Sequence, residues 1–181
     1  EVLPETTTTP IGNAPVRDVG NVEFEGLPQH FTHAPELRST VRLYLASTSP
    51  ARLATLRAAG IDPLLLSPGV DEEAVAAAAA PLSGVELVML LARAKAEAVV
   101  GSTVDGEPID GFILGGDSAF EFEGNVYGKP HLPEVARERW AAMRGRTGQL
   151  HSGHWLIDHR GGVATAAVGG SSTATVTFSS G

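Results

Sequence analysis

The segment Leu43-Tyr44-Leu45-Ala46-Ser47-Thr48-Ser49-Pro50-Ala51-Arg52-Leu53 is the most informative stretch of this 181-residue chain. It predicts a buried strand, a hydroxyl-rich turn, and a helix that opens with Pro50 and then Arg52. A helix N-terminus carries partial positive charge and unpaired N–H groups, so natural first turns favour acidic residues. Here the first turn carries a cation instead. The segment is therefore either an ordinary helix start capped by Ser49 or an anion site of the kind that binds phosphate.

The composition excludes several classes of protein. Apolar residues make up 43% of the chain and charged residues 19%, which is typical of a globular domain. The net charge of −8 disfavours a nucleic-acid partner, because a phosphate backbone demands a basic face. No apolar run of about 18 residues occurs, so no membrane span is predicted. The absence of cysteine excludes disulfides and thiolate metal sites, and it fits a reducing compartment.

The two ends of the chain differ from its middle. Residues 1–40 combine a Thr6–Pro10 run with scattered proline and glycine and show no sustained period, so we expect a disordered N-terminal extension. A metal pair at His30 and His33 is not favoured, because further ligands are lacking. The organised domain is expected over 41–181. It stops just after a predicted strand at Thr173–Phe178, so we expect its C-terminal part to be missing and the bare strand to be a candidate for homodimer pairing.

Periodicity and turn signals predict alternating strands and helices across the domain. Apolar residues at helical spacing form a stripe in the longest helix, from Val85 through Val88, Met89, Ala92 and Ala96 to Val99. The predicted strands cover 41–46, 64–67, 112–122, 125–127, 150–157, 163–168 and 173–178. The predicted helices cover 50–59, 74–80 and 84–100, and a fourth opens at Pro133.

A second candidate site lies in the predicted hairpin that turns at Glu123-Gly124. If Phe122 pairs with Asn125, Lys129 falls opposite Ser118 and next to Asp117, so an acid, a hydroxyl and an ammonium share one end of the hairpin. The aspartate could activate water or hold a metal, and the lysine could neutralise a phosphate. The alternative is a surface salt bridge of little energetic weight.

The acidic segment Asp71-Glu72-Glu73 is a third candidate. Three carboxylates could hold a hard cation such as Mg²⁺. The local pattern favours the alternative, in which they complement the dipole of the helix that follows. His151 and His154 lie three apart in a predicted strand, so they point to opposite faces and should not share a metal.

These motifs, taken together and in this order, resemble the Maf family of nucleotide pyrophosphatases. The resemblance runs from about Arg42 to Phe178 and rests on five pieces whose order and spacing match the family. They are Leu45-Ala46-Ser47-Thr48-Ser49-Pro50-Ala51-Arg52, Val70-Asp71-Glu72, Leu91-Ala92-Arg93-Ala94-Lys95-Ala96, Gly116-Asp117-Ser118 with Gly128-Lys129-Pro130, and Met143-Arg144-Gly145-Arg146 with His151-Ser152-Gly153.

The resemblance implies an α/β fold in which an elongated, mixed, twisted sheet is flanked by helices, with two lobes and a central cleft. It implies hydrolysis of nucleoside triphosphates to a monophosphate and pyrophosphate, with Mg²⁺ or Mn²⁺, in the cytoplasm. The family is also linked to nucleotide house-cleaning and to arrest of septum formation, so the resemblance implies these roles as well.

The resemblance also implies a role for each site residue. Asp117 would be the general base and a metal ligand, and Glu72 would assist the metal or the attacking water. The phosphates would be held by Arg52, Lys95 and Lys129, with help from Ser47, Ser49 and Ser118.

Two departures from the family bear on function. The first arginine of the family's opening signature is replaced by Ala51 here. A cation that helps family members to select the nucleobase of the substrate is therefore missing. The chain also ends before a family segment that contacts the nucleotide. Two rival functions therefore stay open, namely a non-catalytic nucleotide-binding regulator of septum formation and another small-molecule phosphohydrolase.

Overall fold

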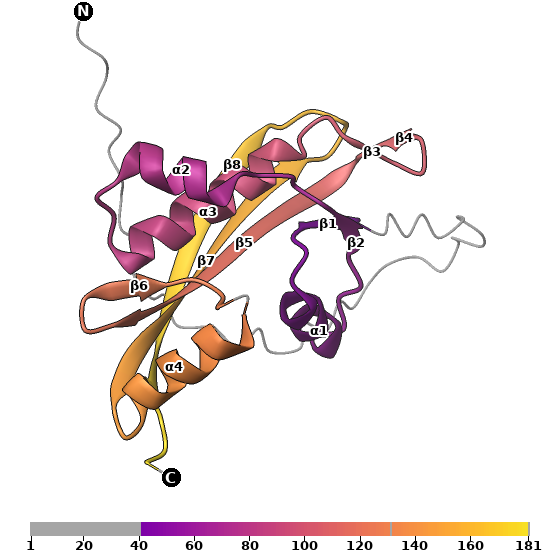
Figure 1. The fold of residues 1–181 in the computed structure, drawn as a ribbon. Helices are drawn as coiled ribbons and strands as arrows, with labels where there is room; N and C mark the ends of the chain where they lie inside the picture. The colour runs from indigo at the N-terminus through magenta and orange to yellow at the C-terminus, as the bar shows by residue number, and fades with distance from the viewer. Residues whose placement is uncertain (1–40, 131, 181) are drawn as a thin grey trace, which may run out of the picture. The chain divides into compact units, whose positions relative to one another are not determined.

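The computed structural model describes residues 41–130 and 132–180. The expected disorder of residues 1–40, with the His30 and His33 pair, lies outside them. The described residues contain four helices and eight strands (Figure 1). In chain order these are β1 Leu43–Ala46, α1 Pro50–Ala58, β2 Leu64–Leu66, α2 Glu72–Ala79, α3 Gly84–Ala98, β3 Thr103–Val104, β4 Glu107–Pro108, β5 Gly111–Phe122, β6 Asn125–Tyr127, α4 Pro133–Met143, β7 Thr147–His159 and β8 Ala166–Thr177.

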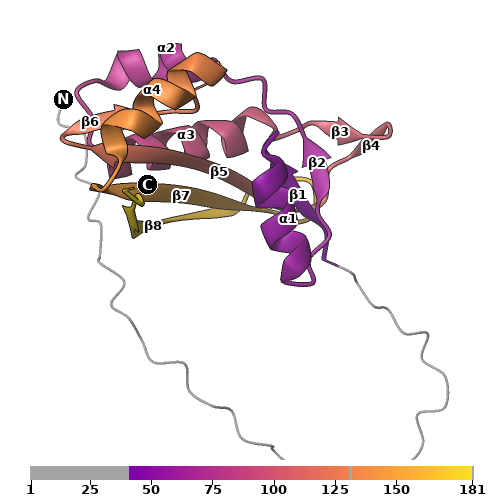
Figure 2. The ribbon, with the colours of Figure 1, turned by 60° about the horizontal axis from the view of Figure 1, so that its bottom comes forward.

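A mixed sheet of six strands organises the domain. Its order is β2-β1-β5-β7-β8, and β6 pairs with β5. β1 runs parallel to β2 and β5, whereas β6, β7 and β8 join antiparallel. Helices flank this sheet, so the predicted α/β class with a mixed sheet is confirmed (Figure 2). The division into two lobes stays a prediction.

The inner strand β1 is apolar on both faces because both are covered. Tyr44, Leu45 and Ala46 are all at most 1% exposed, as expected of a parallel strand inside an α/β sheet. Tyr44 and Ala46 join Ile113 of β5 and Ala96 of α3 in the main core cluster. This cluster anchors the end of β1 against α3, and the turn at Ser47 begins there.

Local signals set the predicted helix starts. Ser49 caps α1 and accepts a hydrogen bond from the Arg52 amide, and Pro50 takes the first helical position. Ser83 and Glu86 form a capping box at the start of α3. Asp71 caps α2, which begins at Glu72 rather than at the predicted residue 74.

The hairpin of β5 and β6 has the predicted register. Phe122 pairs with Asn125 across Glu123 and Gly124. Both turn residues adopt positive φ, at 51° and 75°, which is the geometry of the two-residue turns that suit a right-twisted hairpin. The ladder ends at Tyr127, so Lys129 lies beyond the paired region rather than opposite Ser118.

One expectation about the elements was wrong. The two strands predicted at 163–168 and 173–178 form one continuous strand, β8, paired with β7 along its whole length. Pairing to a long neighbour overrides the local turn signals there.

The predicted apolar stripe of the longest helix faces the core. Val88, Ala92, Ala96 and Val99 are buried, and Val85 and Met89 are half-buried. Leu91 and Lys95, which were not counted in the stripe, are buried as well. None of the described helices is long and apolar enough to cross a bilayer.

Gly115 sets how closely α3 approaches β5. A methyl group there would overlap the carbonyl oxygen of Ala92 and crowd the backbone nitrogen of Ala96, both in α3. The contact is with helix backbone, which cannot rotate away. Close packing of helix on sheet at this point therefore requires the absence of a side chain.

We predict that Gly115→Ala lowers the free energy of unfolding by about 1–3 kcal/mol, because the added methyl overpacks a rigid contact. Chemical denaturation measures the change. Gly170→Ala in β8 is the matched control, since a Cβ there meets nothing within 4 Å. Equal effects of the two substitutions would contradict the argument.

Candidate functional site

The candidate site lies where one edge of β5 changes its partner. β1 pairs with β5 as far as Gly115, and β6 pairs with β5 from Phe120 onward. Between them, residues 116–119 have no partner strand on that edge within the described part of the chain. Their other edge stays paired with β7 throughout. At this unpaired step, no strand of the described residues covers that edge of β5.

The step also leaves main-chain groups available. The amide of Phe112 donates to the carbonyl of Arg42, on the β1 side, at 2.8 Å. Because alternate residues of a strand direct their N–H and C=O to the same edge, those of Ser118 face the unpaired step.

A cleft of about 800 Å³ opens at this step. Its walls come from the β1–α1 turn, the segment before α2, one side of α3, and β5 with the chain after β6. It is lined by Ser47, Thr48, Ser49, Ala51, Arg52, Ser67, Pro68, Gly69, Val70, Asp71, Glu72, Leu87, Leu91, Lys95, Asp117, Ser118, Ala119, Gly128 and Lys129. All eight predicted site residues are among them, so the fold brings together side chains that are up to 82 positions apart, from Ser47 to Lys129.

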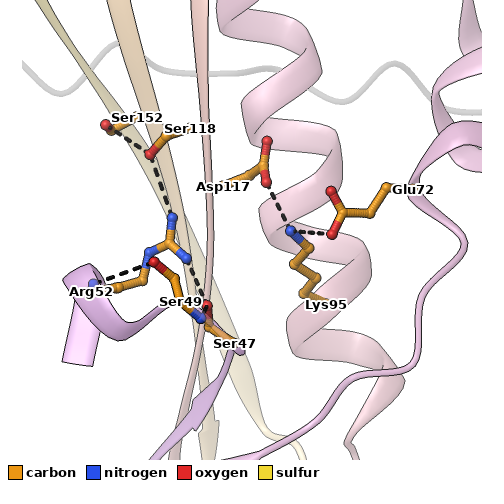
Figure 3. A network of polar contacts seen from close by, with 8 residues as sticks. All are labelled: Ser47, Ser49, Arg52, Glu72, Lys95, Asp117, Ser118 and Ser152. Atoms are coloured by element: carbon orange, nitrogen blue, oxygen red, sulfur yellow. Dashed lines mark hydrogen bonds and ion pairs between the residues drawn. The ribbon is translucent and has the colours of Figure 1, made fainter. Parts of the chain in front are cut away.

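Arg52 occupies one face of β5. Its guanidinium donates to the hydroxyl of Ser47 at 2.7 Å and to that of Ser118 at 3.4 Å (Figure 3). It lies directly over Gly116, where a Cβ would fall 2.6 Å from Nε. Ser47 also accepts the amide of Ser49 at 3.2 Å. The hydroxyls of the opening turn thus hold the arginine side chain in place as well as capping the helix.

The charge on Arg52 is not neutralised locally. No carboxylate in the described residues lies within 4.0 Å of its guanidinium, and its hydrogen-bond partners there are hydroxyls. Burial lowers the pKa of the guanidinium, against the attraction of Asp117 and Glu72. A partly buried cation that lacks an anion is a favourable place for a phosphate oxygen.

Lys95 occupies the opposite face of β5. Its ammonium lies 2.8 Å from Oδ1 of Asp117 and 2.8 Å from Oε1 of Glu72 (Figure 3). The side chains of Lys95 and Asp117 are only 9% and 13% exposed, whereas that of Glu72 is 52% exposed. Asp117 and Ser118, as neighbours in a strand, point to opposite faces, which is why Asp117 contacts Lys95 while Ser118 contacts Arg52.

The charges around Asp117 oppose one another. Burial raises the pKa of Asp117 and is the largest effect. The hydrogen bond and charge of Lys95, with the charge of Arg52, lower that pKa, whereas the charge of Glu72 raises it. An aspartate whose pKa is raised, in a cleft and with one oxygen uninvolved with Lys95, is suited to accept a proton.

Lys129 reaches the cleft from the chain after β6. It is exposed and, within the described residues, makes no ion pair. It contributes an exposed positive charge to the cleft, in contrast to Arg52 and Lys95, which are held by contacts with other side chains. Glu73, the third acid of its segment, is also exposed and does not line the cleft.

Sequence reasoning missed one contributor to the site. Ser152 of β7 pairs with Ser118 in register, and their hydroxyls are 3.2 Å apart, which extends the chain of contacts from Arg52. The neighbouring His154 has a lowered pKa, because of burial first and the charge of Arg52 second. Only the register of the long β5–β7 pair places them there. His151, as predicted, points to the other face, where it contacts Glu121 and Thr173.

The two carboxylates fit part of a divalent metal site. Glu72 and Asp117 converge on one point, the position of the Lys95 nitrogen, and carboxylate oxygens are the donors that Mg²⁺ and Mn²⁺ prefer. Within residues 41–130 and 132–180, no three His, Asp or Glu side chains lie close enough together to hold a metal ion by themselves. The donor set therefore suits an ion that completes its shell with water and ligand phosphates.

The fold is an α/β fold, and its cleft holds an aspartate together with three cationic side chains. The family model described as Maf-like protein matches residues 42–180, and the chain therefore belongs to the Maf family.

The chain is similar to proteins named nucleoside triphosphate pyrophosphatase. The chain is 66% identical over 142 residues to a nucleoside triphosphate pyrophosphatase of Leifsonia xyli subsp. xyli, over 76% of this chain and 66% of that protein. It is 47% identical over 140 residues to the protein of the same name from Nocardia farcinica, over 77% and 66%. The chain thus spans about 66% of the length of these relatives.

A solved structure described as a nucleoside-triphosphatase, or dITP/XTP pyrophosphatase, of Mycobacterium abscessus is also similar. Its TM-score is 0.40 at 15% identity, and the match covers 77% of this chain and 73% of that one.

We predict that Arg52→Met weakens binding of inorganic pyrophosphate about tenfold, because it removes one charge-assisted contact to the anion. Isothermal titration calorimetry measures the affinity. Arg57→Met is the control, since Arg57 lies in the same helix but pairs with Asp62 at 2.8 Å, and neither residue lines the cleft. Equal losses in both variants would show that general charge, rather than the cleft, binds the anion.

Proposed function

We propose that the protein hydrolyses nucleoside triphosphates to a nucleoside monophosphate and pyrophosphate. The observation that carries the proposal is the ion pair of Asp117, whose side chain is 13% exposed, with Lys95 on one face of β5, while Arg52 contacts the adjacent Ser118 on the other face. Membership of the Maf family and the similarity to proteins named nucleoside triphosphate pyrophosphatase support the same activity. The proposed location is the cytoplasm, where nucleoside triphosphates are abundant.

In the proposed reaction, a water molecule attacks the α-phosphorus and transfers a proton to Asp117. The bond between the α-phosphorus and the oxygen that bridges to the β-phosphate breaks, and pyrophosphate leaves with the electron pair. In the ligand-free protein, Oδ1 of Asp117 accepts a hydrogen bond from Lys95. Oδ2 is therefore the oxygen that we expect to take the proton when Asp117 acts as general base.

The cations bind and orient the phosphates. Arg52 and Lys95 approach from opposite faces of the unpaired step, and Lys129 adds charge at the rim. Charge develops on phosphoryl oxygens during the reaction, so preorganised cations stabilise the transition state more than the bound substrate. Ser47 and Ser49 position Arg52 and the start of α1. Ser118 offers both its hydroxyl and its backbone amide to a phosphoryl oxygen.

We infer that Mg²⁺ or Mn²⁺ takes part, with Glu72 and Asp117 as its protein ligands. When bound, the ion would neutralise phosphate oxygens as pyrophosphate leaves. The site does not indicate which nucleobase is preferred, because Ala51 lines the cleft without adding a charge.

We predict that Asp117→Asn lowers the rate of pyrophosphate release at least about 100-fold, because amide cannot accept the proton. The assay follows pyrophosphate and orthophosphate from a panel of nucleoside triphosphates with Mg²⁺ or Mn²⁺. Asp105→Asn is the control, since Asp105 lies in the distant β3–β4 turn at φ 52°, a conformation that asparagine tolerates.

The products separate the rival functions. Release of orthophosphate without pyrophosphate would reject a pyrophosphatase in favour of another phosphohydrolase. Tight nucleotide binding without turnover would favour a non-catalytic regulator of septum formation.

We further predict that kcat/KM is lost on acidification at a pH above the ordinary aspartate value of about 3.9. The base acts only when ionised, and burial raises the pKa of Asp117, so protonation abolishes activity as the pH falls through that raised pKa. The profile of kcat/KM reports the free enzyme, which makes it the appropriate measurement. An acid limb at or below the ordinary value would exclude Asp117 as the base.

A further inference from the structure

Lys95 lies where a divalent cation would have to lie. Its ammonium is 2.8 Å from one oxygen of Asp117 and 2.8 Å from one oxygen of Glu72, which come from β5 and from the first turn of α2. No other described pair of carboxylates in the cleft converges in this way. A metal ion bound by these two oxygens would occupy the point where the Lys95 ammonium lies. The ion and the ammonium therefore cannot be there together.

We propose that Lys95 competes with the divalent metal for the Glu72–Asp117 pair, so that the nucleotide-free protein holds its own ammonium in place of the ion. This inference rests on the proposed function, because it concerns the metal of that site. Two positive groups at one point repel strongly when water is largely excluded, and Lys95 is only 9% exposed. Metal entry therefore requires Lys95 to leave.

The cleft offers Lys95 one alternative partner, the phosphates of the substrate. Lys95 and Glu72 both line the cleft, and Glu72 is half exposed, so both side chains have room to turn toward it. An ammonium that has lost both carboxylates is costly to leave buried and unpaired. Metal and triphosphate should therefore bind together, with the ammonium passing from the carboxylates to a phosphate as the ion takes its place.

The wild-type protein allows a direct test, because Lys95 and Lys129 are its two lysines. Acetic anhydride labelling, followed by mass spectrometry, measures the reactivity of each amine. Without metal, the buried Lys95 should react slowly and the exposed Lys129 rapidly. Saturating Mn²⁺ should raise the labelling rate of Lys95 several-fold and leave that of Lys129 unchanged. An unchanged Lys95 rate in the presence of bound Mn²⁺ would overturn the proposal.

Binding of Mn²⁺ alone, followed by electron paramagnetic resonance of the free ion, gives the second test. Lys95→Met should tighten Mn²⁺ binding at least about tenfold, because it removes the competing charge. Lys95→Met with Glu72→Gln should lose that gain. Arg93→Met is the matched control, since Arg93 lies in the same helix and pairs with the exposed Glu97 at 2.8 Å. Thermal unfolding of each variant reports whether it is folded.

Three results would count against the competition. Lys95→Met could bind Mn²⁺ no more tightly than the wild type, or the double variant could retain the gain, or no variant could bind the ion. Each would show that the ammonium does not stand in for a metal. None of them touches pyrophosphate release, which is measured separately, so this inference and the proposed activity can fail independently.

Discussion

The unpaired step of β5 is the constraint on which the cleft depends. A strand of twelve residues is paired along its β7 edge, but its other edge passes from β1 to β6 with residues 116–119 left open. Consecutive residues at this step point to opposite faces, so one short segment presents Asp117 to α3 and Ser118 to α1. Had β1 or β6 been longer, main-chain pairing would have filled the space where the cleft opens.

The electrostatics of the cleft follow from that geometry. One face holds the Arg52 guanidinium among hydroxyls, and the other holds the Lys95 ammonium between two carboxylates. The two faces thus differ in charge. The first carries a cation without a carboxylate partner, whereas on the second two carboxylates share a single ammonium.

Several features followed from neighbouring residues alone. The hairpin register of Phe122 and Asn125 depends on two turn residues, and the starts of α1 and α3 depend on caps within three positions. Other features could not be predicted in this way. The single strand β8 depends on pairing to β7 over its whole length. Ser152 lies beside Ser118 because of the register between β5 and β7, although the two residues are 34 positions apart in the sequence.

The sequence by itself determined the chemistry, because residue types and their order along the chain specify which acids, cations and hydroxyls are present and which helices they cap. Only the tertiary structure decided which of them meet. Arg52 and Lys95 are both cations that the motifs singled out, yet one contacts Ser118 and the other Asp117, because the alternation of β5 sends adjacent side chains to opposite faces. That separation is a property of sheet geometry, which no local pattern of residues contains.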